Sequence, residues 1–243
     1  MTVEELLNYY ETRVVGKSFP MTQSRIHEKA TGKAMFTVDV DLPGMLYAKI
    51  LRSPHAHAKI IKIDTSKAKR LPGVKAVLTH KEVGQYILRD EAALDNRVRY
   101  VGDRVAAVAA ESEDVAEEAL ELIDVEYEVL PAVFDPEEAM KPDAPIIHPD
   151  VPLVKGRGNL RDPIYAYGVG DVEKGFREAD YVFENRYITT RQAACCPEPH
   201  AYVASWDPSG KLTYWASAQG VFTVRTVLSR VLNKPENEIR VIV

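Results

Sequence analysis

The chain has 243 residues, which is enough for one large domain or two small ones. Its composition is that of an ordinary globular protein, and the formal net charge of −5 is spread along the sequence, so the clustered basic surface of a nucleic-acid-binding protein is not expected. No stretch approaches the roughly 20 apolar residues that span a membrane, and the acidic N-terminus is unlike a secretory signal. We therefore expect a cytoplasmic protein with no membrane or nucleic-acid partner.

Periodicity and capping residues predict the elements of the N-terminal half. Thr2 and Glu5 have the spacing of a capping box, which predicts a helix over about 3–11. Ser112 is a candidate N-cap of the clearest helix, over 112–123, because acidic residues fill the first turn. The other elements expected here are a helix at 66–70 and strands at 45–51, 58–63, 74–79, 105–110 and 124–129.

Residues 134–165 have a different character from the rest of the chain. Seven prolines lie between Pro131 and Pro163, and the apolar periodicity is lost, which predicts a linker. Because strands and helices do not alternate regularly, an α+β fold is favoured over a doubly wound one. Beyond the linker we expect a hairpin turn at 207–210, helices at 172–179 and 222–232, and strands at 181–189, 201–206, 211–217 and 239–243.

Several sequence phrases, taken in order and spacing, resemble one known protein family. Five phrases of the first half resemble the a/b hammerhead domain of the xanthine dehydrogenase and aldehyde oxidase family: KATGKA at 29–34, LRSPHAHA at 51–58, LPGV at 71–74, YVGDRVA at 100–106 and VEYEVLP at 125–131. Later phrases resemble the opening of the family's molybdopterin-binding region: GDV at 170–172, AD at 179–180, EP at 198–199, VA at 203–204 and AQG at 218–220. The resemblance covers the chain from about residue 24 onward.

The resemblance implies an N-terminal part of the family's large subunit. We expect an N-terminal helix and extension at 1–24, an a/b hammerhead domain at 25–133, the Pro-rich linker at 134–165, and the start of an incomplete α+β molybdopterin-binding domain at 166–243. In the family this region continues to a glycine-rich loop, further cofactor contacts and a catalytic glutamate. We therefore expect the chain to be inactive without a further polypeptide, whether it is a split subunit or a truncated frame.

The resemblance also implies a component of a molybdenum-dependent oxidoreductase, which hydroxylates an electron-poor carbon with oxygen from water. The molybdenum-pyranopterin cofactor would be shared with a missing C-terminal segment or a partner chain. Since the sequence has neither a cysteine run for an iron-sulfur cluster nor a dinucleotide fingerprint, FAD and 2Fe-2S groups are expected on partner subunits, beside a C-terminal molybdopterin-binding chain.

Two alternatives to this function stay open. One is a non-catalytic hammerhead interaction module or a truncated remnant, and the other is a subunit like that of 4-hydroxybenzoyl-CoA reductases. Relatives act on purines, aldehydes, N-heterocycles and aromatic thioesters, so no substrate is assigned.

Gln219 is the residue that the resemblance marks as a cofactor contact. In the family, the glutamine at the end of this strand hydrogen-bonds a ligand oxygen of molybdenum, and an amide suits that role because it donates or accepts without adding charge. The alternative is a polar residue at a strand-to-helix turn. No catalytic residue and no metal ligand is assigned.

Two other groups invite a metal-site interpretation. Cys195, Cys196 and Glu198 fit no common zinc spacing, and we expect both cysteines to be buried as small apolar residues. His55 and His57 would share one face of an extended segment, but the family resemblance favours a structural role. In many family members a histidine stands where this chain has Ala194, which leaves the shape of the substrate channel open.

Overall fold

The computed structural model describes residues 28–83, 87–88, 91–162 and 167–243. The helix expected over 3–11 therefore lies outside the described residues. Contacts divide the chain into two units, one of Leu42–Cys195 with Arg230–Asn233, and one that includes residues 28–41, Cys196–Ser229 and Lys234–Val243. None of the helices in the described ranges is long and apolar enough to span a membrane.

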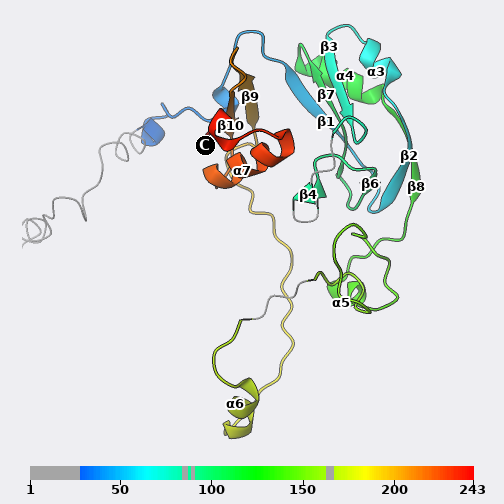
Figure 1. Cartoon of the computed structure of the whole chain (residues 1–243), viewed down its shortest axis with the longest axis vertical. Coiled ribbons are helices and arrows are strands. Elements are labelled where there is room, and N and C mark those ends of the chain that lie inside the picture. Colours follow the sequence, from blue (N-terminus) through cyan, green and yellow to red (C-terminus); the bar gives the residue numbers. More distant parts are fainter. Residues whose placement is uncertain (1–27, 84–86, 89–90, 163–166) are drawn as a thin grey trace, which may run out of the picture. The chain divides into compact units, whose positions relative to one another are not determined.

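The first unit contains two antiparallel three-stranded sheets (Figure 1). One has the order β1 (Tyr47–Arg52), β7 (Arg104–Ala110), β3 (Val74–Thr79), and the other has the order β6 (Arg97–Val98), β2 (Ala58–Asp64), β8 (Asp124–Val129). Strands β4 (Ile87–Leu88) and β5 (Glu91–Ala92) form a separate pair. The helices of this unit are α3 (Ser66–Arg70), α4 (Glu113–Glu121), α5 (Pro136–Ala139) and α6 (Val172–Glu178).

Small side chains let α4 lie close against β1 and β7. Ser112 caps this helix as predicted, because its side chain accepts a hydrogen bond from the Val115 N–H at 3.2 Å. Ala116 and Ala119 of α4 are fully buried, as are Ala106 and Ala110 of β7. The apolar core of this unit is therefore built around the central strand β7, with Val105 and Val108 as its largest buried members there.

Asn159 organises the proline-rich segment that precedes α6. Its side-chain oxygen accepts from the Ile147 N–H at 2.8 Å, and its amide group donates to the carbonyls of Pro145 at 3.0 Å and Ala139 at 3.1 Å. Gly158 beside it has φ +54°, and a Cβ there would overlap the Ala139 carbonyl oxygen. Together with backbone hydrogen bonds, such as the one from the Asn159 N–H to the Ala139 carbonyl at 2.8 Å, these side-chain bonds hold residues 139–159 as a compact loop.

The strand predicted over 181–189 is absent, and this prediction was wrong. Asp171 caps α6, but residues 179–198 form no helix or strand and are exposed. A strand is stable only when its backbone groups pair with a neighbour, and none of the described strands pairs with this segment. Its aromatic residues are consequently in solvent, with Tyr187 85% exposed.

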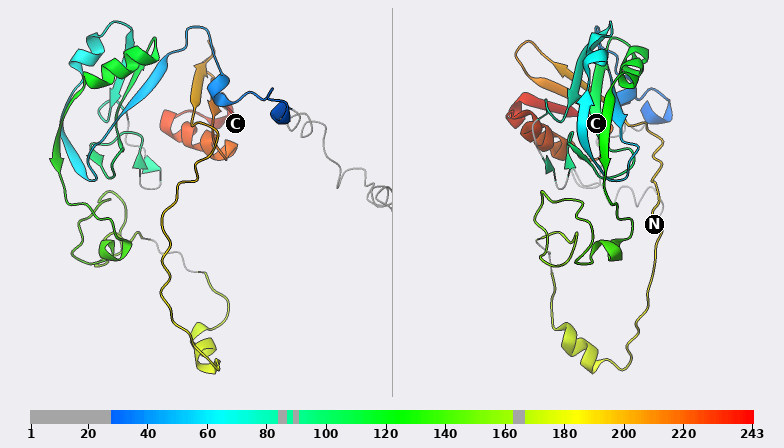
Figure 2. Two further views of the ribbon diagram at one scale, coloured as in Figure 1. Left: turned by 180° about the vertical axis from the view of Figure 1, so that it is seen from behind. Right: turned by 90° about the vertical axis from the view of Figure 1, so that its right-hand side faces the viewer.

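The second unit is built on one small sheet with the order β11 (Ile239–Ile242), β10 (Leu212–Ala216), β9 (Tyr202–Trp206). Its C-terminal strands and helix are coloured orange to red in Figure 2. It also contains η1 (Thr37–Asp39), η2 (Glu236–Glu238) and most of α7 (Val221–Leu232), whose residues from Arg230 onward are grouped with the first unit. Strands β9 and β10 form the predicted hairpin, in which Asp207 accepts from the N–H groups of Ser209 and Lys211. Strands β10 and β11 are parallel and joined through α7, while the fold as a whole is α+β as predicted.

The apolar core of the second unit is small. In the described part of the chain beyond residue 123, the buried apolar residues are Leu212, Ala216 and Ile239. The apolar face predicted for α7 is only half-buried, since Val224, Val227 and Leu228 are partly covered and Val231 is 36% exposed. Hydrophobic burial therefore stabilises this unit much less than the first one.

Candidate functional site

The predicted contact Gln219 lies in the turn between β10 and α7. Its side chain is exposed, and it follows the carboxyl end of β10. In sheets with a parallel strand–helix–strand unit, ligands bind beyond the carboxyl ends of the strands. The structure thus puts Gln219 at the edge of the second unit where a ligand is expected.

The first turn of α7 adds hydrogen-bond donors to this edge. The Val224 N–H donates to the Gly220 carbonyl at 3.0 Å, so the helical ladder begins there and the preceding N–H groups of the first turn have no helical acceptor. No acidic residue stands in this turn. The site consequently offers donors and the positive end of a helix dipole, which together favour a negatively charged or oxygen-rich ligand.

Side chains of α7 fix this helix to η2. Arg225 forms an ion pair with Glu236 at 3.1 Å, and Thr226 donates to the other carboxylate oxygen of Glu236 at 2.7 Å. The Arg225 guanidinium also lies 5.2 Å from the centroid of the Phe222 ring. These contacts hold the first half of α7, which follows the turn at Gln219, against η2.

Ser217 joins a second segment to the same edge. The Ser217 N–H donates to the Ala201 carbonyl at 3.0 Å. The Ser217 hydroxyl accepts from the Ala201 N–H at 3.2 Å and donates to the Pro199 carbonyl at 3.0 Å. Glu198 and His200, both exposed, flank Pro199. The site therefore combines two segments, 198–201 and 217–220. The prediction from sequence found Glu198 and Gln219 as landmarks but missed Ser217.

Both cysteines are exposed, so the prediction that they are buried was wrong. The reason lies in the preceding segment, residues 179–194, which is exposed throughout and gives Cys195 and Cys196 no apolar environment. Cys195 also has φ +46°, a left-handed conformation that is rare outside glycine. Among the residues that the structure describes, no three or more His, Cys, Asp or Glu side chains form a metal-binding group.

The two histidines of the first unit have structural contacts. His57 is 3% exposed, with Nδ1 2.6 Å from the Pro131 carbonyl and Nε2 3.5 Å from the Arg97 guanidinium. The His55 ring lies edge-on to Tyr127, with centroids 4.9 Å apart. Both ring nitrogens of His57 are thus engaged, which supports the structural interpretation over a two-histidine metal site.

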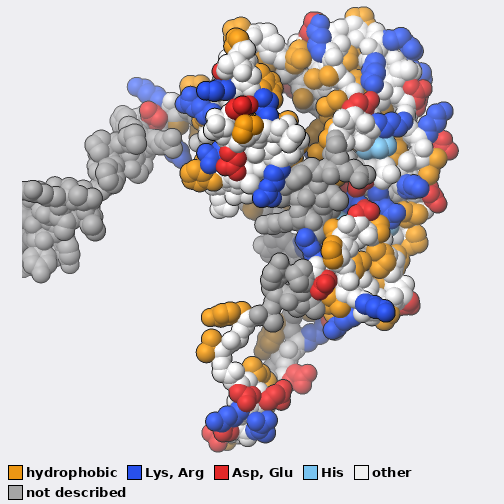
Figure 3. Space-filling model, viewed as in Figure 1, with side chains coloured by type: hydrophobic (Ala, Val, Ile, Leu, Met, Phe, Trp, Pro, Cys, Tyr) orange, Lys and Arg blue, Asp and Glu red, His pale blue; other side chains and the backbone are white. Residues whose placement is uncertain are grey.

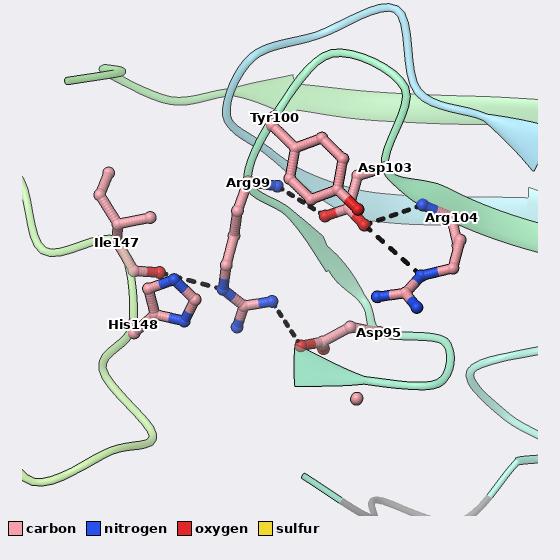
Figure 4. A pocket seen from close by; sticks show the side chains of 8 residues that line it. Asp95, Arg99, Tyr100, Asp103, Arg104, Ile147 and His148 are labelled. Carbon is pink, nitrogen blue, oxygen red and sulfur yellow. Dashed lines mark hydrogen bonds and ion pairs between the residues drawn. The ribbon is translucent and has the colours of Figure 1, made fainter. Parts of the chain in front are cut away.

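Arg99 is one of the residues that line a polar cavity of about 110 Å³ in the first unit (Figure 4). Arg99 donates to Asp95 at 2.7 Å and to the Ile147 carbonyl at 3.2 Å, while Asp103 accepts from the N–H groups of Arg99 and Arg104. The charged side chains of this cluster pair with one another, and Arg99 also lies 3.5 Å from Asp150. The cluster ties residues 147–150 to the loop before β7, and we assign it a structural role.

The chain matches two known families over most of its length. Residues 31–131 match the family described as "Aldehyde oxidase and xanthine dehydrogenase, a/b hammerhead domain", and residues 157–243 match the "Molybdopterin cofactor-binding domain". A probable xanthine dehydrogenase subunit of Bacillus subtilis is 41% identical over 220 residues, and the nicotinate dehydrogenase large molybdopterin subunit of Eubacterium barkeri is 36% identical over 236 residues. These alignments cover 88% and 95% of this chain, but 28% and 53% of the two relatives.

A solved structure has the same fold. The crystal structure of Cu,Mo-CO dehydrogenase in its carbon monoxide reduced state superposes with a TM-score of 0.77 at 37% identity, over 90% of this chain and 30% of that chain. Gln219 and Ser217 both lie within the match to the cofactor-binding domain.

Proposed function

Because this chain belongs to the aldehyde oxidase and xanthine dehydrogenase family, we propose that it contributes one wall of the molybdenum-cofactor site of an oxidoreductase. The single observation that carries this proposal is the place of Gln219. It is exposed at the junction of β10 and α7, inside the segment that matches the cofactor-binding domain. We propose it as a direct contact of the cofactor.

The residues of this turn suit the chemistry of the cofactor. The ligand oxygens and dithiolene sulfurs of a molybdenum-pterin group are electron-rich, and the turn offers a neutral amide, helix N–H groups and no carboxylate. When bound, the group supplies the redox chemistry of hydroxylation, with water as the oxygen source. The part proposed for this chain is to bind and orient the group through Gln219 and the first turn of α7.

We further propose that additional polypeptide covers residues 167–189 of the first unit and, separately, the second unit, whose apolar core is small. Figure 3 shows hydrophobic side chains on the surface near α6. The large apolar residues of this segment are each more than half exposed: Tyr167, Val169, Val172, Phe176, Tyr181, Phe183, Tyr187 and Ile188. An apolar surface of this kind favours association. The relatives, of which this chain spans 28% and 53%, have such additional polypeptide.

FAD and 2Fe-2S groups are proposed to lie on other subunits or regions of the assembly. The relatives are named for xanthine, nicotinate and carbon monoxide, so the substrate is left open between a heterocycle and a smaller molecule. A non-catalytic hammerhead module is less well supported, since residues 157–243 match a cofactor-binding domain. A cytoplasmic location stays a prediction from the sequence.

The test is Gln219→Ala in the complete molybdopterin-binding protein, with Gln192→Ala as the matched control. Gln192 is also exposed but lies outside the turn. We expect Gln219→Ala to lower the molybdenum and pterin content of the purified protein, while the control keeps both. Equal content in the two variants would contradict a contact at Gln219.

A further inference from the structure

We infer that Ser217 is the positioning residue of this site: its hydroxyl holds Pro199 and Ala201 against the end of β10, and so presents the segment with Glu198 beside the turn with Gln219. The inference rests on the proposed function, because it concerns the same edge of the sheet. Ser217 would act through its neighbours, without touching the cofactor.

The hydrogen bonds at Ser217 extend the β9–β10 ladder by one irregular step. The last regular pair of the two strands is Tyr202 with Ala216. At the next position the Ser217 N–H still reaches the Ala201 carbonyl, at 3.0 Å. The return bond, however, goes from the Ala201 N–H to the Ser217 hydroxyl, at 3.2 Å. A side chain thus takes the place of a backbone acceptor at the point where the ladder ends.

Two prolines explain why a hydroxyl is needed at this point. Pro197 and Pro199 have no N–H, so the segment before Ala201 has fewer donors with which to continue a ladder. The Pro199 carbonyl is instead held by the Ser217 hydroxyl, at 3.0 Å. The Ser217 hydroxyl therefore accepts from Ala201 and donates to Pro199. Threonine has a hydroxyl that can make both bonds, and alanine has none.

The consequence for the site is a fixed relation between two segments. Gln219 follows Ser217 by two residues, and Glu198 precedes the held Pro199 directly. When both hydroxyl bonds are present, neither segment can shift along β10 without breaking one of them. Loss of the hydroxyl leaves a single backbone bond, about which residues 197–200 can move away from the turn.

Hydrogen exchange and NMR on the full chain test this directly. In Ser217→Ala we expect the Ala201 N–H to exchange about fivefold faster, since one hydrogen bond is lost, and the side-chain amide signal of Gln219 to shift. Ser217→Thr should restore both values. Ser205→Ala, a serine replacement within β9, is the control and should change neither. Unchanged tryptophan fluorescence verifies that the variants are folded. Unchanged Ala201 exchange and an unmoved Gln219 signal in Ser217→Ala would overturn the inference.

Cofactor retention in the complete molybdopterin-binding protein separates this inference from the proposed function. We expect both Ser217→Ala and Gln219→Ala to lower the amount of pterin released on denaturation, and Ser217→Thr to keep it. Full retention in Ser217→Ala alone would overturn the positioning role and leave the contact at Gln219 standing. Full retention in both variants would contradict the proposed function, and the exchange and amide measurements would then decide the inference by themselves.

Discussion

Replacing Glu82 by glutamine should remove a pH-dependent part of the stability of the first unit. One oxygen of this carboxylate accepts from the Thr79 hydroxyl at 2.6 Å and from the Thr79 N–H at 2.9 Å, and the other lies 3.4 Å from the Lys69 ammonium. The hydroxyl hydrogen bond is the main cause that lowers the pKa of Glu82 from 4.5 to about 2, with the N–H and Lys69 adding to it. Thr79 is 2% exposed at the end of β3.

The sign and size of the effect follow from this lowered pKa. Because the folded state holds the proton less tightly than the unfolded state, the stabilisation is complete above pH 4.5 and is lost as the pH falls toward 2. The difference between the two pKa values corresponds to at most about 3 kcal/mol. Since 37% of the Glu82 side chain is exposed, solvent screening reduces this to about 1 kcal/mol.

Urea unfolding at pH 7, 5, 4 and 3, followed by far-UV circular dichroism, measures the difference in the free energy of unfolding between the wild type and Glu82→Gln. Both tryptophans, Trp206 and Trp215, lie in the second unit, so their fluorescence is an internal control that Glu82→Gln should leave unchanged. We expect the variant to be about 1 kcal/mol less stable at pH 7, with the difference shrinking below pH 4.5. Glu118→Gln, on the exposed face of α4, serves as the control. A deficit that is the same at pH 7 and pH 3 would refute the reasoning.

Three further predictions concern stability. Gly158→Ala should destabilise the loop by about 2 kcal/mol or more, because the added Cβ overlaps the Ala139 carbonyl and the φ of +54° is unfavourable; unchanged resistance of the loop to limited proteolysis would count against this. Val108→Ala should lower the free energy of unfolding of the first unit by about 2 kcal/mol, as measured by urea unfolding. Val108 is 1% exposed, so the change removes two buried methyl groups and leaves a cavity. In the isolated chain we expect strong hydrogen-exchange protection over 105–129 and weak protection over 211–243; equal protection would show that the second unit needs no further polypeptide.

The sequence predicted best those elements whose signals are local. The apolar run of β7 and the cap at Ser112 each depend on a few neighbouring residues, and both are found as expected. The hairpin at Asp207 is another such case. The prediction failed at 181–189, where residues typical of a strand have no partner with which to pair. Propensity indicates what a segment prefers, but pairing depends on a neighbour that is often distant in sequence.

In the candidate site, too, the residue with a local sequence signal was predicted and the residue that depends on distant partners was missed. Gln219 was predicted because the phrase AQG at 218–220 resembles the family's molybdopterin-binding region. The structure adds that its side chain is exposed and that it follows the end of β10. Ser217 was missed because its partners, Pro199 and Ala201, are 18 and 16 residues away and reach it only after the hairpin has formed. Pro197 and Pro199 were the signal in the sequence that could have pointed to Ser217. Because they lack backbone N–H donors, the segment before β9 needs a side-chain hydrogen bond to stay beside β10.

The two exposed cysteines give this protein a built-in probe of assembly. Cys195 and Cys196 are the two cysteines of the chain, and they stand side by side just before the segment that Ser217 holds. Their rate of alkylation therefore reports on a single location, without an engineered label. Polypeptide that covers this stretch should slow the alkylation, so assembly can be followed in time by mass spectrometry of one peptide.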